Sequence, residues 1–309
     1  MRRANQPDRH SSERGGLSAA VCRTVVLAAF ALAVGGCGAS GSAKAVDPTP
    51  APSTMLALGD SYSSGEGTKE SDGECGRSPT AYPELVATTA DLELVNETCT
   101  GAKVDDVAAQ VGAGGDTRFD VITISIGGND AGFAALLADC VGLDDALAIA
   151  TGSDALSTLS LRSCDVTPDE LDDRARALDE RLSALYATIV DDHLAPHGQL
   201  FVVGYPRLFA ASDRWASDEG ERCDGVTRAD ADALGVGVAQ LDAVIEARVD
   251  DQAAATFIDA AATFEGHERC TEDPWLQGFT VRPRLRSSFH PNEAGHAAVA
   301  EAITSQIRS

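Results

Sequence analysis

The most informative segment for the fold is Val121-Ile-Thr-Ile-Ser-Ile126, which is followed directly by Gly127-Gly128. Its β-branched residues and the glycine pair that ends it predict a buried β-strand closed by a turn. Four other short apolar runs predict further strands. They lie at Thr54–Leu58, Leu92–Val95, Leu200–Val203 and Thr256–Ile258.

Helical patterns lie between these runs. Thr167 precedes Pro168 as a helix N-cap would. Apolar residues then recur at helical intervals, at Leu171, Leu178, Leu182, Leu185 and Ile189. Residues Ala229–Val249 and Glu293–Ile307 also have a helical pattern. The alternation predicts an α/β protein, a three-layer α/β/α sandwich with a mostly parallel five-stranded sheet. Ligands of such sheets bind beyond the carboxyl ends of the strands, where we expect the functional residues.

The charge of the chain argues against two kinds of partner. The 309 residues include 48 Asp and Glu but only 24 Lys and Arg, a formal net charge of −24. Nucleic-acid binding needs a basic surface that displaces counterions, and an anionic lipid surface repels an acidic protein. We therefore expect no nucleic-acid partner and no attachment to a membrane by charge.

The N-terminal residues have the features of a targeting segment. An arginine-rich start is followed by the apolar run Thr24–Val34, which is too short to span a bilayer but suits a signal peptide. The next residues, Val34-Gly35-Gly36-Cys37, resemble a bacterial lipobox, which predicts a signal peptide over residues 1–36 and a lipid on Cys37. The alternative is cleavage after Ala43-Lys44-Ala45, which would release the protein.

Three regions follow from this assignment. Residues 37–53 begin with the lipidated cysteine and continue as a flexible tether of mostly small residues. Residues 54–309 form one domain, which we expect to be a monomer. The predicted location is outside the cytoplasm, as a lipoprotein whose only membrane contact is its N-terminal anchor. A secreted enzyme is the alternative.

The number and spacing of the cysteines are consistent with an exported protein. Cys22 belongs to the leader and Cys37 to the lipobox, and the other six of the eight cysteines lie in the domain. None of the six has C-x-x-C spacing, so we expect no metal site. An even number in an exported chain favours three disulfides. Other pairings are open to the sequence, and we predict pairing between neighbours: Cys75–Cys99, Cys140–Cys164 and Cys223–Cys270.

Several polar blocks follow the predicted strands or lie near the C-terminus. The principal ones are Gly59-Asp-Ser-Tyr-Ser-Ser-Gly65, Gly127-Gly-Asn-Asp130 and Phe289-His-Pro-Asn292. Smaller blocks are Arg77-Ser78, Ala81-Tyr-Pro83, Glu97-Thr-Cys-Thr-Gly-Ala102 and Gly204-Tyr-Pro206. Each block alone is weak, because short glycine-containing motifs usually mark turns. In this order, from Thr54 to the C-terminus, the blocks resemble the GDSL/SGNH hydrolases, and most closely their secreted actinobacterial lipase and esterase branch.

The resemblance implies an SGNH hydrolase fold and assigns roles to four residues. Ser61 is the nucleophile and His290 the base. The main-chain N–H groups of Ser61 and Gly101 and the side-chain amide of Asn129 form the oxyanion hole. Acyl transfer needs such a set, a nucleophile with a base and with donors for the developing oxyanion. His296 is the second candidate for the base, although we expect it to pack within a helix.

One position departs from the commoner family pattern. Many members carry an Asp three residues before the histidine, where this chain has Ser287. Some members of the secreted branch use a main-chain carbonyl instead, so we predict a Ser61–His290 dyad oriented by the carbonyl of Ser287. We expect Asp60 and Asp130 to be structural, bonding backbone N–H groups in their turns.

The sequence thus predicts an extracytoplasmic carboxylester hydrolase, a lipase or esterase that acts on ester or lipid substrates and needs no cofactor. Two alternatives stay open. The same residues could serve a deacetylase or acyltransferase acting on cell-envelope glycan or lipid. The protein could also be a binding lipoprotein without enzymatic activity.

Overall fold

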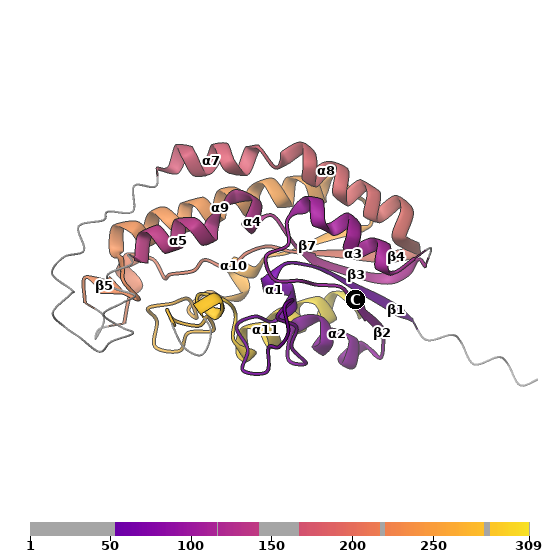
Figure 1. The fold of residues 1–309 in the computed structure, drawn as a ribbon, viewed down its shortest axis with the longest axis horizontal. Coiled ribbons are helices and arrows are strands. Elements are labelled where there is room, and N and C mark those ends of the chain that lie inside the picture. The colour runs from indigo at the N-terminus through magenta and orange to yellow at the C-terminus, as the bar shows by residue number, and fades with distance from the viewer. Residues whose placement is uncertain (1–52, 116, 142–166, 217–219, 281–284, 309) are drawn as a thin grey trace, which may run out of the picture. The chain divides into compact units, whose positions relative to one another are not determined.

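The domain is built on five strands that all pair in parallel. The computed structural model describes residues 53–115, 117–141, 167–216, 220–280 and 285–308 (Figure 1). The strand order is β2-β1-β3-β4-β7. The strands are β1 (Thr54–Gly59), β2 (Glu93–Asn96), β3 (Phe119–Ser125), β4 (Leu194–Val203) and β7 (Ala255–Ile258). The predicted strands and the α/β sandwich are confirmed.

The strand order creates a crevice at one edge of the sheet. The chain passes from β1 to β2 on one side and then crosses to β3 on the other side of β1. Such a reversal leaves a gap beyond the carboxyl ends of the two central strands, where ligands bind. Gly59 pairs with Ser125, so β1 and β3 end side by side. The residues that follow β1 and β3 therefore open into the same crevice.

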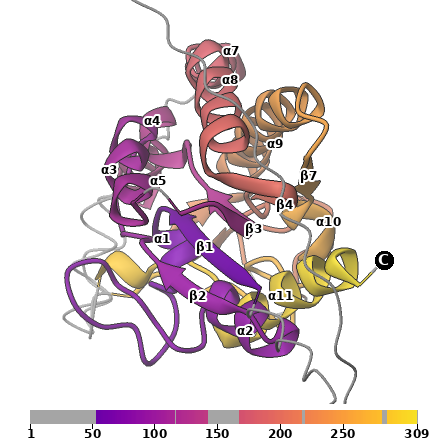
Figure 2. The same cartoon turned by 90° about the vertical axis from the view of Figure 1, so that its right-hand side faces the viewer.

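Both faces of the sheet are buried. In β1, Met55 and Ala57 lie in one apolar cluster, whereas Leu56 and Leu58 lie in the other. The first cluster includes residues of α2 (Tyr82–Ala90), α10 (Ala260–Thr263) and α11 (Glu293–Ile307). The second includes residues of α3 (Val107–Ala113), α8 (Asp179–Thr188) and α9 (Arg228–Asp250). Figures 1 and 2 show these two helical layers on opposite sides of the sheet.

The predicted helix after Thr167 is two helices. Thr167 caps α7 (Pro168–Arg176), its hydroxyl accepting the N–H of Glu170. The chain leaves the helix at Ala177 and resumes as α8, which ends in a π-helical turn. Leu171, Leu178 and Leu182 are buried all the same. The apolar spacing continues across the break between α7 and α8, so periodicity alone does not reveal the break. The predicted helices over 229–249 and 293–307 match α9 and α11.

The remaining elements are short. Helices α1 (Ser61–Ser64), α4 (Gly128–Ala131) and α5 (Phe133–Val141) follow strands β1 and β3, and β5 (Arg222–Cys223) pairs with β6 (Val226–Thr227). Strand β4 begins at Leu194, earlier than predicted, and its pairing with β3 shifts register between Leu194 and Gln199. The sequence did not reveal this start, because residues 195–199 lack a continuous apolar pattern. No helix in the described part of the chain is long and apolar enough to span a membrane. The predicted signal peptide, Cys37 and the tether up to residue 52 lie outside the described residues.

Two predicted disulfides are present, Cys75–Cys99 and Cys223–Cys270. The third, Cys140–Cys164, involves a residue outside the described ranges. The Cys223–Cys270 bond joins the β5–β6 hairpin, which precedes α9, to the loop that follows α10. A link between residues so far apart in the chain restricts the unfolded state and stabilises the native one.

Replacing both Cys223 and Cys270 with Ser should lower the free energy of unfolding by about 2–4 kcal/mol, because the cross-link no longer restricts the unfolded chain. Urea denaturation, followed by circular dichroism, measures this difference against the unchanged protein. An unfolding free energy equal to that of the unchanged protein would show that this bond contributes nothing to stability.

Candidate active site

Ser61 stands where β1 turns into helix α1. Gly59 ends the strand with a φ of +114°, and a Cβ there would lie 2.4 Å from the carbonyl oxygen of Ser125. Only glycine fits so close an approach between β1 and β3. Asp60 then caps the helix, its carboxylate accepting the N–H of Tyr62 at 2.9 Å. Ser61 is thereby the first helical residue and faces the crevice.

His290 lies against Ser61. The Oγ of Ser61 is 2.7 Å from Nε2 of His290, and Nδ1 is 2.9 Å from the carbonyl oxygen of Ser288. The hydrogen bond to Nδ1 comes from the carbonyl of Ser288, one residue after the predicted carbonyl of Ser287. The Ser287 carbonyl accepts the backbone N–H of His290, and its effect on the pKa of the ring is smaller than that of Ser288.

The backbone at Phe289 explains this arrangement. Its φ of +62° is left-handed, a conformation that bulky residues rarely adopt and that costs roughly 1–3 kcal/mol. This turn directs the Ser288 carbonyl back toward the imidazole. The N–H of Phe289 donates to the carbonyl of Gln277 at 3.0 Å, and the hydroxyl of Tyr62 donates to the carbonyl of Phe289 at 2.9 Å. These bonds hold the strained residue in place.

The predicted oxyanion donors gather beside Ser61. Ser61, Gly101 and Asn129 line one cavity. Gly101 has a φ of +84°, and open space lies where its Cβ would stand. Within the described residues, no acceptor is paired with the backbone N–H of Ser61 or Gly101. Asn129 donates one amide hydrogen to the carbonyl of Ala102 at 2.9 Å, which fixes the side chain and leaves its second hydrogen available.

Asp60 and Asp130 both support loops, as predicted. Besides the N–H of Tyr62, Asp60 accepts the hydroxyl of Tyr205 at 2.6 Å, and burial raises the pKa of Asp60 to about 7. Asp130 accepts the N–H of Val104 at 3.0 Å and pairs with Arg181 at 2.9 Å. Neither carboxylate contacts His290.

His296 packs within α11, as expected of a structural residue. It is buried, and its Nδ1 accepts the backbone N–H of Tyr82 at 3.2 Å. Burial lowers the pKa of His296 to about 3. The ring therefore stays neutral and serves the junction between α2 and α11. Among the described residues, no cluster of His, Cys, Asp or Glu is arranged to hold a metal ion.

The cavity beside Ser61 is mostly apolar and has a volume of about 560 Å³. Its apolar lining comes from widely separated elements and includes Phe133, Leu137, Leu208, Val238, Leu241 and Phe279. These residues were not predicted from the sequence, since only the fold brings them together. The arrangement can hold an apolar group next to a serine hydroxyl, a neutral imidazole and unpaired N–H donors.

The comparisons with known proteins agree with this geometry. The sequence pattern of the GDSL-like lipase/acylhydrolase family matches residues 57–298. The chain belongs to this family. It is 32% identical to a lipase from Streptomyces rimosus, over 93% of this chain and 95% of that protein. It is also 32% identical to lipase 1 of Streptomyces coelicolor, over 89% of this chain and 92% of that protein.

Two crystal structures are similar across the domain. The extracellular lipase from S. rimosus gives a TM-score of 0.65 at 30% identity, covering 82% of this chain and 99% of that one. The phospholipase A1 from Streptomyces albidoflavus NA297 gives a TM-score of 0.62 at the same identity and coverage. This GDSL family member is a carboxylic ester hydrolase.

The environment of His290 predicts how ester hydrolysis depends on pH. Burial lowers the pKa of His290 below its ordinary value of 6.5, although the bond to the Ser288 carbonyl opposes that shift. Only the neutral ring accepts a proton, so kcat/KM should fall on acidification with a midpoint below 6.5. A profile of kcat/KM against pH with a chromogenic ester measures this midpoint. A midpoint above 6.5 would contradict the assignment of the acid limb to buried His290.

Proposed function

We propose that the protein is an extracytoplasmic serine carboxylester hydrolase, a lipase or esterase, with Ser61 and His290 as its catalytic dyad. The observation that carries the proposal is the 2.7 Å contact between Ser61 Oγ and His290 Nε2 at the wall of an apolar cavity. The Nδ1–H of the neutral ring donates to the Ser288 carbonyl, which leaves Nε2 free to accept a proton.

The reaction follows from these positions. As Ser61 Oγ attacks the ester carbonyl carbon, its proton moves to Nε2 of His290. The N–H groups of Ser61 and Gly101 and the amide of Asn129 stabilise the oxyanion. His290 then returns the proton to the leaving alcohol, and an acyl group stays on Ser61. A water molecule activated by His290 attacks this acyl-enzyme and releases the carboxylic acid.

The cavity favours a fatty acyl ester over an acetyl ester. A cavity of about 560 Å³ with an apolar lining suits a long hydrocarbon chain, whereas an acetyl group would leave most of it unfilled. The lipases and the phospholipase A1 among the relatives agree with an acyl ester of a lipid as substrate. An acyltransferase would use the same residues with another acceptor in place of water.

Ser61→Ala and His290→Ala should each abolish nearly all hydrolysis of a chromogenic ester, and the double variant should be little worse than either. The two groups act as one unit, so their losses do not add. A double variant that loses far more activity than each single variant would contradict the dyad.

Asn129→Ala tests the role of the Asn129 amide as an oxyanion donor, and its loss of activity should be smaller than that of the dyad variants. Loss of one oxyanion donor typically lowers kcat by about 10²–10³-fold while the fold is kept. An unchanged kcat would mean that Asn129 only shapes the loop through its bond to the Ala102 carbonyl.

A series of esters from acetyl to long acyl chains should show kcat/KM rising with chain length until the apolar cavity is filled, because each buried methylene contributes about 0.8 kcal/mol. Preference for acetyl esters would instead favour a deacetylase. Product analysis with an added alcohol separates hydrolysis from acyl transfer.

The location is proposed from the N-terminal residues. A lipid on Cys37 would hold the enzyme at the outer face of the membrane, with residues 38–53 as the tether. The two disulfides and the extracellular S. rimosus relative agree with a place outside the cytoplasm.

Cell fractionation tests the anchor. The unchanged protein should partition with membranes, whereas Cys37→Ala should appear in the medium or fail to mature, because the lipidated residue is lost. Unchanged protein recovered free, with Val46 at its N-terminus, would establish a secreted enzyme and exclude the lipid anchor.

A further inference from the structure

Glu66 is a completely buried acidic residue that the dyad chemistry does not use. Its side chain is 0% exposed. Helix α1 ends at Gly65 in the left-handed conformation, and the N–H of Glu66 donates to the carbonyl of Ser61 at 3.4 Å. A buried carboxylate is costly unless donors surround it. The partners of Glu66 therefore indicate why the chain retains it.

The carboxylate contacts two separate loops of the site. Its Oε1 accepts the Nε–H of Arg286 at 2.9 Å and the hydroxyl of Ser287 at 3.2 Å. Its Oε2 accepts the hydroxyl of Thr100 at 3.0 Å. Thr100 directly precedes the oxyanion residue Gly101. Arg286 and Ser287 directly precede Ser288, whose carbonyl orients His290. One side chain thus links the oxyanion loop to the histidine loop.

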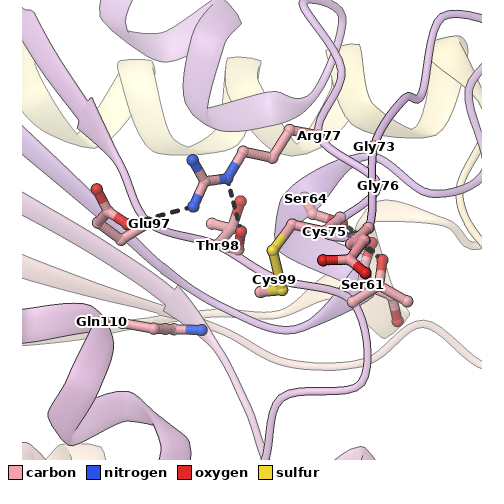
Figure 3. Close-up of a disulfide and its surroundings, with 12 residues drawn as sticks. Ser61, Ser64, Gly73, Cys75, Gly76, Arg77, Glu97, Thr98, Cys99 and Gln110 are labelled. Atoms are coloured by element: carbon pink, nitrogen blue, oxygen red, sulfur yellow. Dashed lines mark hydrogen bonds and ion pairs between the residues drawn. A yellow bond between two sulfur atoms is a disulfide. The ribbon is translucent and has the colours of Figure 1, made fainter.

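A third loop, residues 73–76, packs against the contact between Glu66 and Thr100. The N–H of Thr100 donates to the carbonyl of Cys75 at 3.0 Å, next to the Cys75–Cys99 disulfide. The hydroxyl oxygen of Thr100 also lies 3.0 Å from this carbonyl, so its one hydrogen is shared between the acceptors on Cys75 and Glu66. Figure 3 shows this disulfide beside Ser61 and Ser64. A Cβ on Gly76 would lie 2.2 Å from Oε2 of Glu66, so the loop has no room for a side chain there.

Arg286 also bonds the loop over residues 73–76. Its guanidinium donates to the carbonyl of Glu74 at 3.3 Å and to that of Gly73 at 2.9 Å, in addition to Glu66. The buried carboxylate therefore joins the oxyanion loop to the histidine loop directly, and the loop over residues 73–76 is joined to it through Arg286. Replacing this carboxylate with a neutral amide would weaken the charge-assisted bond from Arg286 and remove one of the two acceptor oxygens that Arg286, Thr100 and Ser287 share.

The charge of Glu66 also affects the pKa of His290, the proposed base. His290 has no acidic side chain on Nδ1, and a carbonyl stabilises an imidazolium less than a carboxylate does. Glu66 raises the pKa of His290, and Arg286 lowers it. The phenol ring of Tyr62 is a second titratable group beside the imidazole, with ring centroids 4.9 Å apart. A charge on His290 also lowers the pKa of His296 in α11.

We propose that Glu66 is a positioning residue, which aligns Gly101 through Thr100 and His290 through Arg286 and Ser287. This inference rests on the proposed function, because it assigns Glu66 a task in ester hydrolysis. Glu66 itself touches neither the substrate nor the reacting atoms.

The test compares Glu66→Gln with Glu70→Gln in the full-length enzyme. Both variants remove one negative charge from the same loop, but Glu70 is exposed. With a chromogenic ester, Glu66→Gln should lower kcat by about 10–100-fold with little change in KM, because misplaced groups slow the reaction more than they weaken binding. The acid limb of its pH profile should move to lower pH, because the imidazolium has lost a favourable charge. Glu70→Gln should change neither quantity.

The outcomes separate this inference from the proposed function. A Ser61→Ala variant that stays active would refute the dyad. With Ser61→Ala inactive, a Glu66→Gln enzyme with unchanged kcat and an unshifted acid limb would overturn the role of Glu66. The same shift in both glutamate variants would also overturn it, since any charge in the loop would then suffice.

If circular dichroism shows that Glu66→Gln does not fold, two other variants test the proposal. Thr100→Val and Ser287→Ala each remove one donor to Glu66 and keep its charge. Each should lower kcat severalfold at nearly constant KM, and unchanged kcat in both would overturn the proposal.

Discussion

The site depends on the close approach of β1 and β3 at their carboxyl ends. Gly59 lies so near the carbonyl of Ser125 that no side chain fits, and the N–H of Asp60 donates to that carbonyl at 3.0 Å. The amide of Gln110 holds Gly59 from the other side, accepting its N–H at 2.8 Å and donating to its carbonyl at 3.0 Å. The turn into α1 is therefore rigid, and Ser61 has one position relative to the crevice.

His290 reaches this crevice from the far end of the chain, and its loop stores backbone strain in doing so. The left-handed Phe289 turns the Ser288 carbonyl toward Nδ1, and the bond from Tyr62 compensates part of the cost. Tyr62 follows Ser61 directly, so the segment that carries the proposed nucleophile also supports the loop that carries the proposed base. Glu66 adds a second connection between the same two segments.

Local signals in the sequence were sufficient for most of the sheet. β3 was predictable because its β-branched residues end at a glycine pair, and α11 because its residues follow a helical pattern. The break between α7 and α8 was not predictable, because neither Gly nor Pro marks it and the apolar spacing continues across it. The early start of β4 was not predictable, because residues 195–199 lack the continuous apolar pattern of a buried strand.

The α/β alternation was predictable from periodicity, and Ser61, Gly101, Asn129 and His290, which the fold brings to one cavity, were predictable from motifs next to strands that resemble a known family. The order of the cysteines left other pairings open, and the structure confirms two of the pairs predicted between neighbours. The fold was needed to show that Nδ1 of His290 bonds the carbonyl of Ser288 rather than that of Ser287. The fold was also needed to show that Glu66 is buried between two loops and that distant apolar residues enclose a cavity. Backbone dihedral angles and long-range packing set these contacts, and neither leaves a periodic signal in the chain.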